Sequence, residues 1–167
     1  MSQYLNFVDL KYKPRKNDLI CLFRIEPSRG ISFNEAAGRV AAESSNGTWT
    51  TLTTIKKIIE KIRARAFWRQ GNLVKIAYPS ELFEPGNMSQ IYSSIAGNIF
   101  GLKAVNNLRL EDIDFPENII KSFKGPQFGI SGVRKFMGVR KRPLLATVPK
   151  PKVGLYAEEH AKIAYDA

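Results

Sequence analysis

The chain has 167 residues, of which 44% are hydrophobic and 25% charged, a globular composition that excludes a disordered chain. No apolar run approaches the ~18 residues of a membrane span, and the N-terminus lacks the pattern of a secretory signal, so no membrane partner is expected. Cys21 and His160 are the single cysteine and histidine, which excludes an internal disulfide and an ordinary zinc site and fits a reducing, cytoplasmic compartment.

The first elements are predicted from short apolar patterns. Residues 1–18 are polar and predict irregular structure, and the apolar run 20–25 predicts a buried strand. Ser32 and Glu35 have the spacing of a capping box, and apolar residues at helical spacing follow, so a helix is expected over 33–44.

The next elements complete a regular order. Residues 54–69 predict a short helix followed by a strand, and 73–78 predicts the second arm of a hairpin. A helix is expected over 88–98 and a strand over 102–115. The order strand–helix–strand–strand–helix–strand predicts an α+β domain of the ferredoxin-like kind.

The remainder of the chain has a different pattern. Residues 116–142 predict short helical pieces, 144–148 a buried strand and 158–167 a helix. One strand and one helix cannot enclose a hydrophobic core, so we expect this pair to be the first part of a larger domain. We therefore expect one domain over 1–125 and a separate segment over 126–167.

The net charge of +11 is concentrated in two segments. Residues 56–69 carry six bases and one acid, and residues 134–152 carry seven bases and no acid. Such segments suit a nucleic acid, a phosphorylated small molecule or an acidic protein surface, or they form a solvated basic face.

Four stretches of sequence carry a family resemblance. They are AAESSNGTWT at 41–50, IAGNIFG at 95–101, NLRLED at 107–112 and KPKVGL at 150–155. In this order and spacing the chain resembles the large chain of ribulose-1,5-bisphosphate carboxylase/oxygenase (RuBisCO), in its archaeal form III type. The resemblance covers the family's N-terminal domain and the first strand and helix of its (β/α)8 barrel, which would then be truncated in this chain.

The resemblance implies an activity and partners. The family adds CO2 or O2 to the enediolate of ribulose 1,5-bisphosphate to give 3-phosphoglycerate, either in CO2 fixation or in nucleotide (AMP) salvage. Its active site lies between the N-terminal domain of one subunit and the barrel of its partner, which implies a homo-oligomer, a dimer or an assembly of dimers. The family uses Mg²⁺, whose ligands would lie beyond residue 167, so the chain alone is expected to be inactive.

The resemblance also assigns four residues of the N-terminal domain. Thr48 and Trp49 match residues at one phosphate of the sugar bisphosphate, and a Gly-Thr turn can direct N–H groups and a hydroxyl at an anion. Glu43 matches a carboxylate that pairs with a lysine on a mobile barrel loop. Asn98 matches a side chain that reaches the substrate in the neighbouring subunit.

Two lysines after the 144–148 segment match residues that the barrel supplies to the family's active site. Lys150 matches the family's acid/base lysine, and Lys152 matches a substrate-contacting lysine that would help to depress the pKa of Lys150. Pro149 departs from the family, which has Ile or Val at that position, and it removes a backbone donor from the expected strand. We therefore expect altered chemistry at Lys150.

Two other functions remain open from the sequence. One is a non-catalytic domain that docks onto a complete large chain. The other is a basic module that binds RNA through the sheet, with Phe67 and Trp68 as stacking residues. The aromatic-rich run typical of such RNA-binding sheets is absent, which argues against the RNA function.

Overall fold

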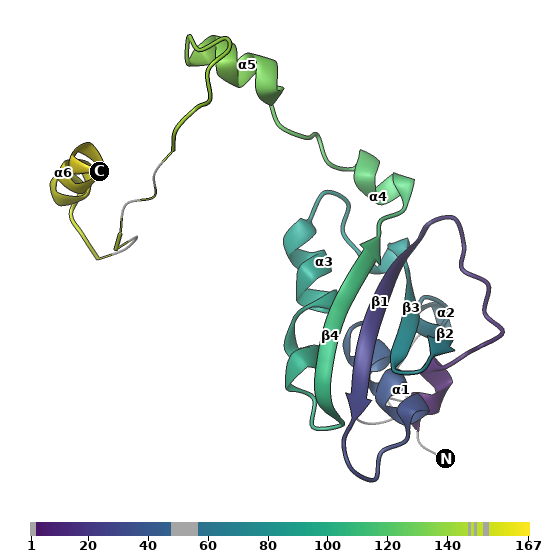
Figure 1. Ribbon diagram of the computed structural model, residues 1–167. Helices are drawn as coiled ribbons and strands as arrows, with labels where there is room; N and C mark the ends of the chain where they lie inside the picture. Colours follow the sequence, from purple (N-terminus) through teal and green to yellow (C-terminus); the bar gives the residue numbers. More distant parts are fainter. Residues whose placement is uncertain (1–2, 48–56, 147, 149, 152–153) are drawn as a thin grey trace. The chain divides into compact units, whose positions relative to one another are not determined.

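The structure is a computed structural model that describes residues 3–47, 57–146, 148, 150–151 and 154–167 (Figure 1). The chain forms two compact units, Met1–Lys124 and Gly125–Ala167, which are described separately. Among the described residues, no helix is both long and apolar enough to cross a membrane.

The first unit is built on a four-stranded antiparallel sheet. The strands are β1 (Asp18–Pro27), β2 (Arg65–Gln70), β3 (Leu73–Pro79) and β4 (Val105–Asp114). They lie side by side in the order β2-β3-β1-β4, so β1 and β3 form the centre (Figure 1). With helices α1 (Phe33–Glu43) and α3 (Met88–Ile95), this arrangement confirms the predicted α+β class and the predicted order of strands and helices.

The core lies on one face of the sheet because the strands alternate. In β1, four alternate residues are fully buried, namely Leu19, Cys21, Phe23 and Ile25. They belong to one apolar cluster with residues of α1 and α3, such as Val40 and Ile91. β1 is longer than predicted, because β3 and β4 both pair with it and supply hydrogen-bond partners beyond its apolar run.

Helix α1 begins where the sequence predicts. The Ser32 hydroxyl accepts a hydrogen bond from the Glu35 N–H at 3.2 Å, which satisfies one of the free donors of the first turn. The Glu35 carboxylate pairs instead with Arg39 one turn later, at 2.8 Å. Half of the predicted capping box is therefore formed, and the helix ends one residue earlier than expected, at Glu43.

The segment 54–69 also follows the prediction where it is described. A short helix α2 (Lys57–Lys61) precedes β2, and β2 turns into β3 through Gly71. Gly71 has φ of 57°, a left-handed conformation that suits glycine in a tight hairpin turn. The sequence therefore placed the hairpin correctly.

Two boundaries differ from the prediction. The helix predicted over 88–98 ends at Ile95, and Asn98 begins a 3-10 turn, η3 (Asn98–Gly101). Gly97 separates the two, with φ of −99° and ψ of −126°, values outside the helical region. The following strand begins at Val105, three residues after the predicted start, because η3 and its own turn use the intervening residues.

The N-terminal segment is more ordered than predicted. Gln3–Phe7 forms a 3-10 turn, η1, that packs against α1. Val8 then pairs with Ala66 in a single parallel bridge beside the edge strand β2. A Cβ at Gly38 would overlap the backbone carbonyl of Tyr4, so glycine in α1 allows this close approach.

After β4, the chain continues in short helices, as predicted. They are α4 (Glu117–Lys121) in the first unit, and α5 (Gly129–Phe136) and α6 (Ala157–Asp166) in the second. One further 3-10 turn, η2 (Ser80–Leu82), lies earlier, between β3 and α3. The strand predicted at 144–148 is wrong for its described residues 144–146 and 148, and Leu145 is 98% exposed. A strand needs a partner for its N–H and C=O groups, and no other strand lies among the described residues of this unit.

Candidate functional site

Two of the predicted site residues lie in direct contact although 55 positions separate them. Glu43 is the last residue of α1, and Asn98 begins η3. The Asn98 Nδ2 donates a hydrogen bond to the Glu43 Oε1 at 2.5 Å. Among the described residues, no other hydrogen bond involves either side chain, so Oε2 of Glu43 and Oδ1 of Asn98 remain available to a ligand.

The backbone on both sides of Asn98 is held by the core. Ile95 and Ile99 are fully buried, whereas Asn98 itself is exposed. A Cβ at Gly97 would overlap the carbonyl of Ser93, so a glycine is needed for the chain to turn at this point. The polar side chain is thus presented to solvent by a backbone with little freedom to move.

The turn after Glu43 is fixed by its own side chains. Ser44 donates to the Val40 carbonyl at 2.6 Å, Ser45 accepts from the Ala64 N–H at 3.4 Å, and Asn46 donates to the Ile59 carbonyl at 2.5 Å. Gly47 closes the turn through its N–H to the Ala42 carbonyl at 2.9 Å. The run that ends α1 is therefore attached both to the helix itself and to the segment that leads into β2.

The structure does not test the other predicted site residues. Thr48, Trp49 and Lys152 lie outside the described residues, as does Pro149. Lys150 belongs to the second unit, and its side chain is exposed. Their assigned roles stay predictions.

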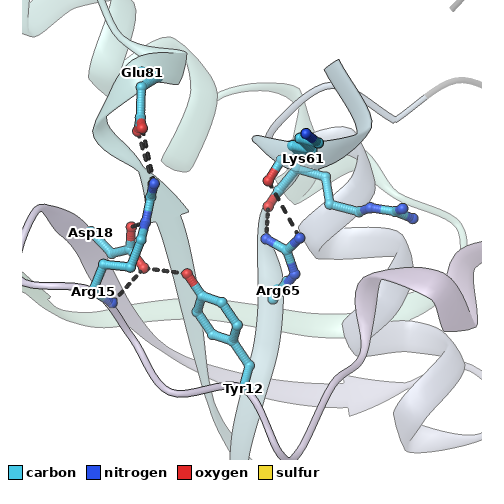
Figure 2. A network of polar contacts seen from close by, with 7 residues as sticks. Tyr12, Arg15, Asp18, Lys61, Arg65 and Glu81 are labelled. Atoms are coloured by element: carbon cyan, nitrogen blue, oxygen red, sulfur yellow. Dashed lines mark hydrogen bonds and ion pairs between the residues drawn. The ribbon is translucent and has the colours of Figure 1, made fainter. Parts of the chain in front are cut away.

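A polar network that the sequence analysis missed lies at the start of β1 (Figure 2). The buried carboxylate of Asp18 accepts hydrogen bonds from the Tyr12 hydroxyl at 2.5 Å, the Arg15 N–H at 2.9 Å and the Arg15 Nε at 3.0 Å. The same guanidinium forms two further hydrogen bonds to Glu81, at 2.9 and 2.8 Å. The only signal in the sequence is a lone aspartate before an apolar run, which is too common to predict a network.

This network is structural, because its groups are occupied by one another. Burial and the Asp18 carboxylate raise the pKa of Tyr12, while the hydrogen bonds from Arg15 lower the pKa of Glu81. The Asp18 carboxylate already receives three donors, so it offers little to a ligand. The network ties the segment before β1 to η2 after β3.

The arginines of the first basic segment contact aromatic rings of the same chain. Arg63 lies over Phe7 at 5.7 Å, Arg65 over Tyr12 at 4.9 Å and Arg69 over Phe33 at 3.9 Å from the ring centroid. Phe67 makes an edge contact with Tyr12, and the Lys75 ammonium lies 5.4 Å from the Trp68 ring. These contacts attach the N-terminal segment and α1 to β2 and to the residues just before it.

The described residues contain no group of three or more His, Cys, Asp or Glu side chains that could hold a metal ion. Cys21, the single cysteine, is fully buried, and burial raises the pKa of its thiol far above the ordinary value. It is therefore not an available thiolate ligand or nucleophile. Mg²⁺ does not fit a site in the described part of this chain.

Comparison with known proteins gives one consistent family. The model of the ribulose bisphosphate carboxylase large chain, N-terminal domain, matches residues 6–119. The ribulose bisphosphate carboxylase of Pyrococcus abyssi is 52% identical over 98% of this chain and 39% of its own length, and that of Archaeoglobus fulgidus is 49% identical over 98% and 38%.

Solved structures agree with the sequence relatives. The octameric ribulose-1,5-bisphosphate carboxylase/oxygenase of Pyrococcus horikoshii, in complex with sulfate, matches with a TM-score of 0.77 and 51% identity over 99% of this chain. The dimeric archaeal enzyme of Hyperthermus butylicus matches with a TM-score of 0.79 and 51% identity. The chain spans about 40% of each of these two proteins.

Proposed function

Because the chain belongs to the family of ribulose bisphosphate carboxylase large chains, through the N-terminal domain matched at residues 6–119, we propose that it is the N-terminal part of such an enzyme. The reaction is the addition of CO2 or O2 to the enediolate of ribulose 1,5-bisphosphate, which gives 3-phosphoglycerate. The setting that the resemblance to the archaeal type implies is CO2 fixation or nucleotide (AMP) salvage, and the single buried cysteine, Cys21, suits a cytoplasmic enzyme.

The observation that carries this proposal is the contact between Glu43 and Asn98. Both residues were assigned by resemblance to one active site, and they lie 2.5 Å apart in the folded domain. The bond directs the Asn98 amide nitrogen at Glu43 and leaves the Asn98 Oδ1 to accept a hydrogen bond from a substrate hydroxyl. The second oxygen of Glu43 is left for a cation, such as the lysine that the family supplies from a barrel loop.

The remaining roles follow from the resemblance. Thr48 and Trp49 bind one phosphate, Lys152 contacts the substrate, and Lys150 Nζ takes and returns a proton at the reacting carbon. Pro149, where the family has Ile or Val, alters how Lys150 is held. These roles belong to the proposal.

The division of the chain also follows from the proposal. Residues 1–125 would form the N-terminal domain, and residues 126–167 would form a linker and the start of the barrel, in which 144–148 could become a strand only when another barrel strand pairs with it. Mg²⁺ chemistry would require ligands outside the described residues, which hold no candidate cluster. We expect the 167-residue chain alone to have no carboxylase activity. We also expect the complete enzyme to be a homo-oligomer, as the octameric and dimeric relatives are.

A chimera tests the function directly. The corresponding first part of the Pyrococcus horikoshii enzyme is replaced by this chain, and incorporation of labelled CO2 into acid-stable product is measured with ribulose 1,5-bisphosphate. We expect activity in the chimera, none in the chain alone, and a loss of about 100-fold in kcat/KM for Glu43→Gln, because the substitution removes the charge that would pair with the barrel lysine.

The matched control is Glu35→Gln, which changes the same residue type on the same helix but breaks only a pair with Arg39. An assembled chimera without activity, or equal effects of the two substitutions, contradicts the proposal. Binding of the chain to a complete large chain without any gain or loss of activity would instead support the docking function.

A further inference from the structure

A second hydrogen bond lies directly behind Glu43, inside the core. The hydroxyls of Ser44 and Tyr78 are 2.8 Å apart. Ser44 is 1% exposed and Tyr78 is fully buried, so neither hydroxyl has access to water. Ser44 is the residue that follows Glu43 and caps α1, whereas Tyr78 comes from the inner face of β3, one of the two central strands.

The donor of this bond can be assigned. The Ser44 hydroxyl has one proton, and the Val40 carbonyl lies 2.6 Å from its oxygen, which makes that carbonyl the acceptor. The Tyr78 hydroxyl must then donate to the Ser44 oxygen. Burial raises the pKa of Tyr78 well above its ordinary value, so the phenol retains the proton that it donates.

This chain of bonds joins the sheet to the predicted site. The Tyr78 hydroxyl donates to Ser44, and the Ser44 hydroxyl donates to a carbonyl in the last turn of α1. Glu43, the residue before Ser44, accepts a hydrogen bond from the Asn98 amide. Ser45 and Asn46 hold only the later part of the turn, against residues that precede β2. Through its hydrogen bond to Ser44, the Tyr78 hydroxyl therefore attaches the Glu43 end of α1 to the centre of the sheet.

We propose that Tyr78 is a positioning residue for Glu43, which it holds in register with Asn98 through Ser44. Tyr78 is not a catalytic residue, since its hydroxyl is enclosed and already engaged. The phenol limits rotation and sliding of the last helical turn. It thereby fixes the distance between the Glu43 carboxylate and the Asn98 amide. The consequence for activity rests on the proposed function, whereas the consequence for the Glu43–Asn98 contact does not.

The first experiment needs no activity. In the 167-residue chain, the side-chain amide resonances of Asn98 are assigned by their loss in Asn98→Asp and are followed by NMR. We expect Tyr78→Phe to shift them toward the positions that Glu43→Gln produces. Tyr92→Phe is the matched control, because that ring is 46% exposed, and it should leave the resonances in place.

The second experiment is a double-mutant cycle in the chimeric carboxylase. Tyr78→Phe should lower kcat/KM about tenfold when Glu43 is present and should have almost no effect in the Glu43→Gln background. A merely structural role would give the same factor in both backgrounds. If Tyr78→Phe fails to fold, Ser44→Ala removes the other partner of the same bond and is tested in the same way.

The two experiments separate the two proposals. An inactive chimera together with Asn98 resonances that respond to Tyr78→Phe contradicts the proposed function and keeps the positioning role. Asn98 resonances that respond to Glu43→Gln but not to Tyr78→Phe or Ser44→Ala overturn the positioning role, as does a cycle in which the effects are independent.

Discussion

The buried network around Asp18 predicts a large loss of stability for a nearly isosteric substitution. In Asp18→Asn, one carboxylate oxygen becomes an NH2 group in a site where the side chain is fully buried. Two donors, from Tyr12 and the Arg15 backbone, end on Oδ2, and the Arg15 Nε ends on Oδ1. Whichever way the new amide is turned, at least one donor faces another donor.

The size of the loss follows from these contacts. A hydrogen bond to a charged group contributes about 1.5–3 kcal/mol, and an unsatisfied buried donor costs about 1–3 kcal/mol. The Arg15 side chain is 48% exposed, so water recovers part of its share. We expect Asp18→Asn to lower the free energy of unfolding by about 2–4 kcal/mol.

Glu81→Gln is the matched control at the other end of the same guanidinium. Its bonds to Arg15 are equally short, but the Glu81 side chain is 49% exposed, so the expected loss is about 0–1 kcal/mol. Urea unfolding of the 167-residue chain at neutral pH, followed by circular dichroism, measures both variants. Equal losses, or a loss below about 1 kcal/mol for Asp18→Asn, would refute the assignment of the stability to the buried carboxylate.

Two further predictions concern buried groups. Burial raises the pKa values of Tyr78 and Cys21, so the stability that they contribute is complete below their unfolded pKa values. It is lost as the pH rises above 9.0 for Cys21 and above 10.0 for Tyr78, by up to about 1.4 kcal/mol per pH unit for each group. Urea midpoints from pH 8 to 11 test this, and Tyr78→Phe should flatten the upper part of the curve. Gly38→Ala should lower the free energy of unfolding by about 1–3 kcal/mol despite the better helix propensity of alanine, because the new Cβ would overlap the Tyr4 carbonyl. Urea unfolding midpoints measure the loss. A gain in stability would show that η1 can move away from α1 without cost.

Most elements of the first unit were predictable because their signals are local. The cap at Ser32, the turn at Gly71 and the alternation in β1 each depend on residues a few positions apart. The strand predicted at 144–148 failed for a related reason, since an apolar run becomes a strand only where another strand pairs with it. Its local pattern was correct for a strand, but the described residues of the second unit include no strand that could pair with it.

The sequence by itself determined the family and most elements of the first domain, because these depend on residue type and spacing. It also nominates Glu43 and Asn98 as site residues, an assignment that stays a prediction. The tertiary structure decided what these residues contact. The Glu43–Asn98 and Ser44–Tyr78 hydrogen bonds join segments that are distant in the chain. The donors to Asp18 are close in sequence, but their sequence pattern is too common to predict the contacts. Such pairs form only when the apolar face of the sheet packs against its helices, since that packing sets which polar groups are enclosed and must find partners.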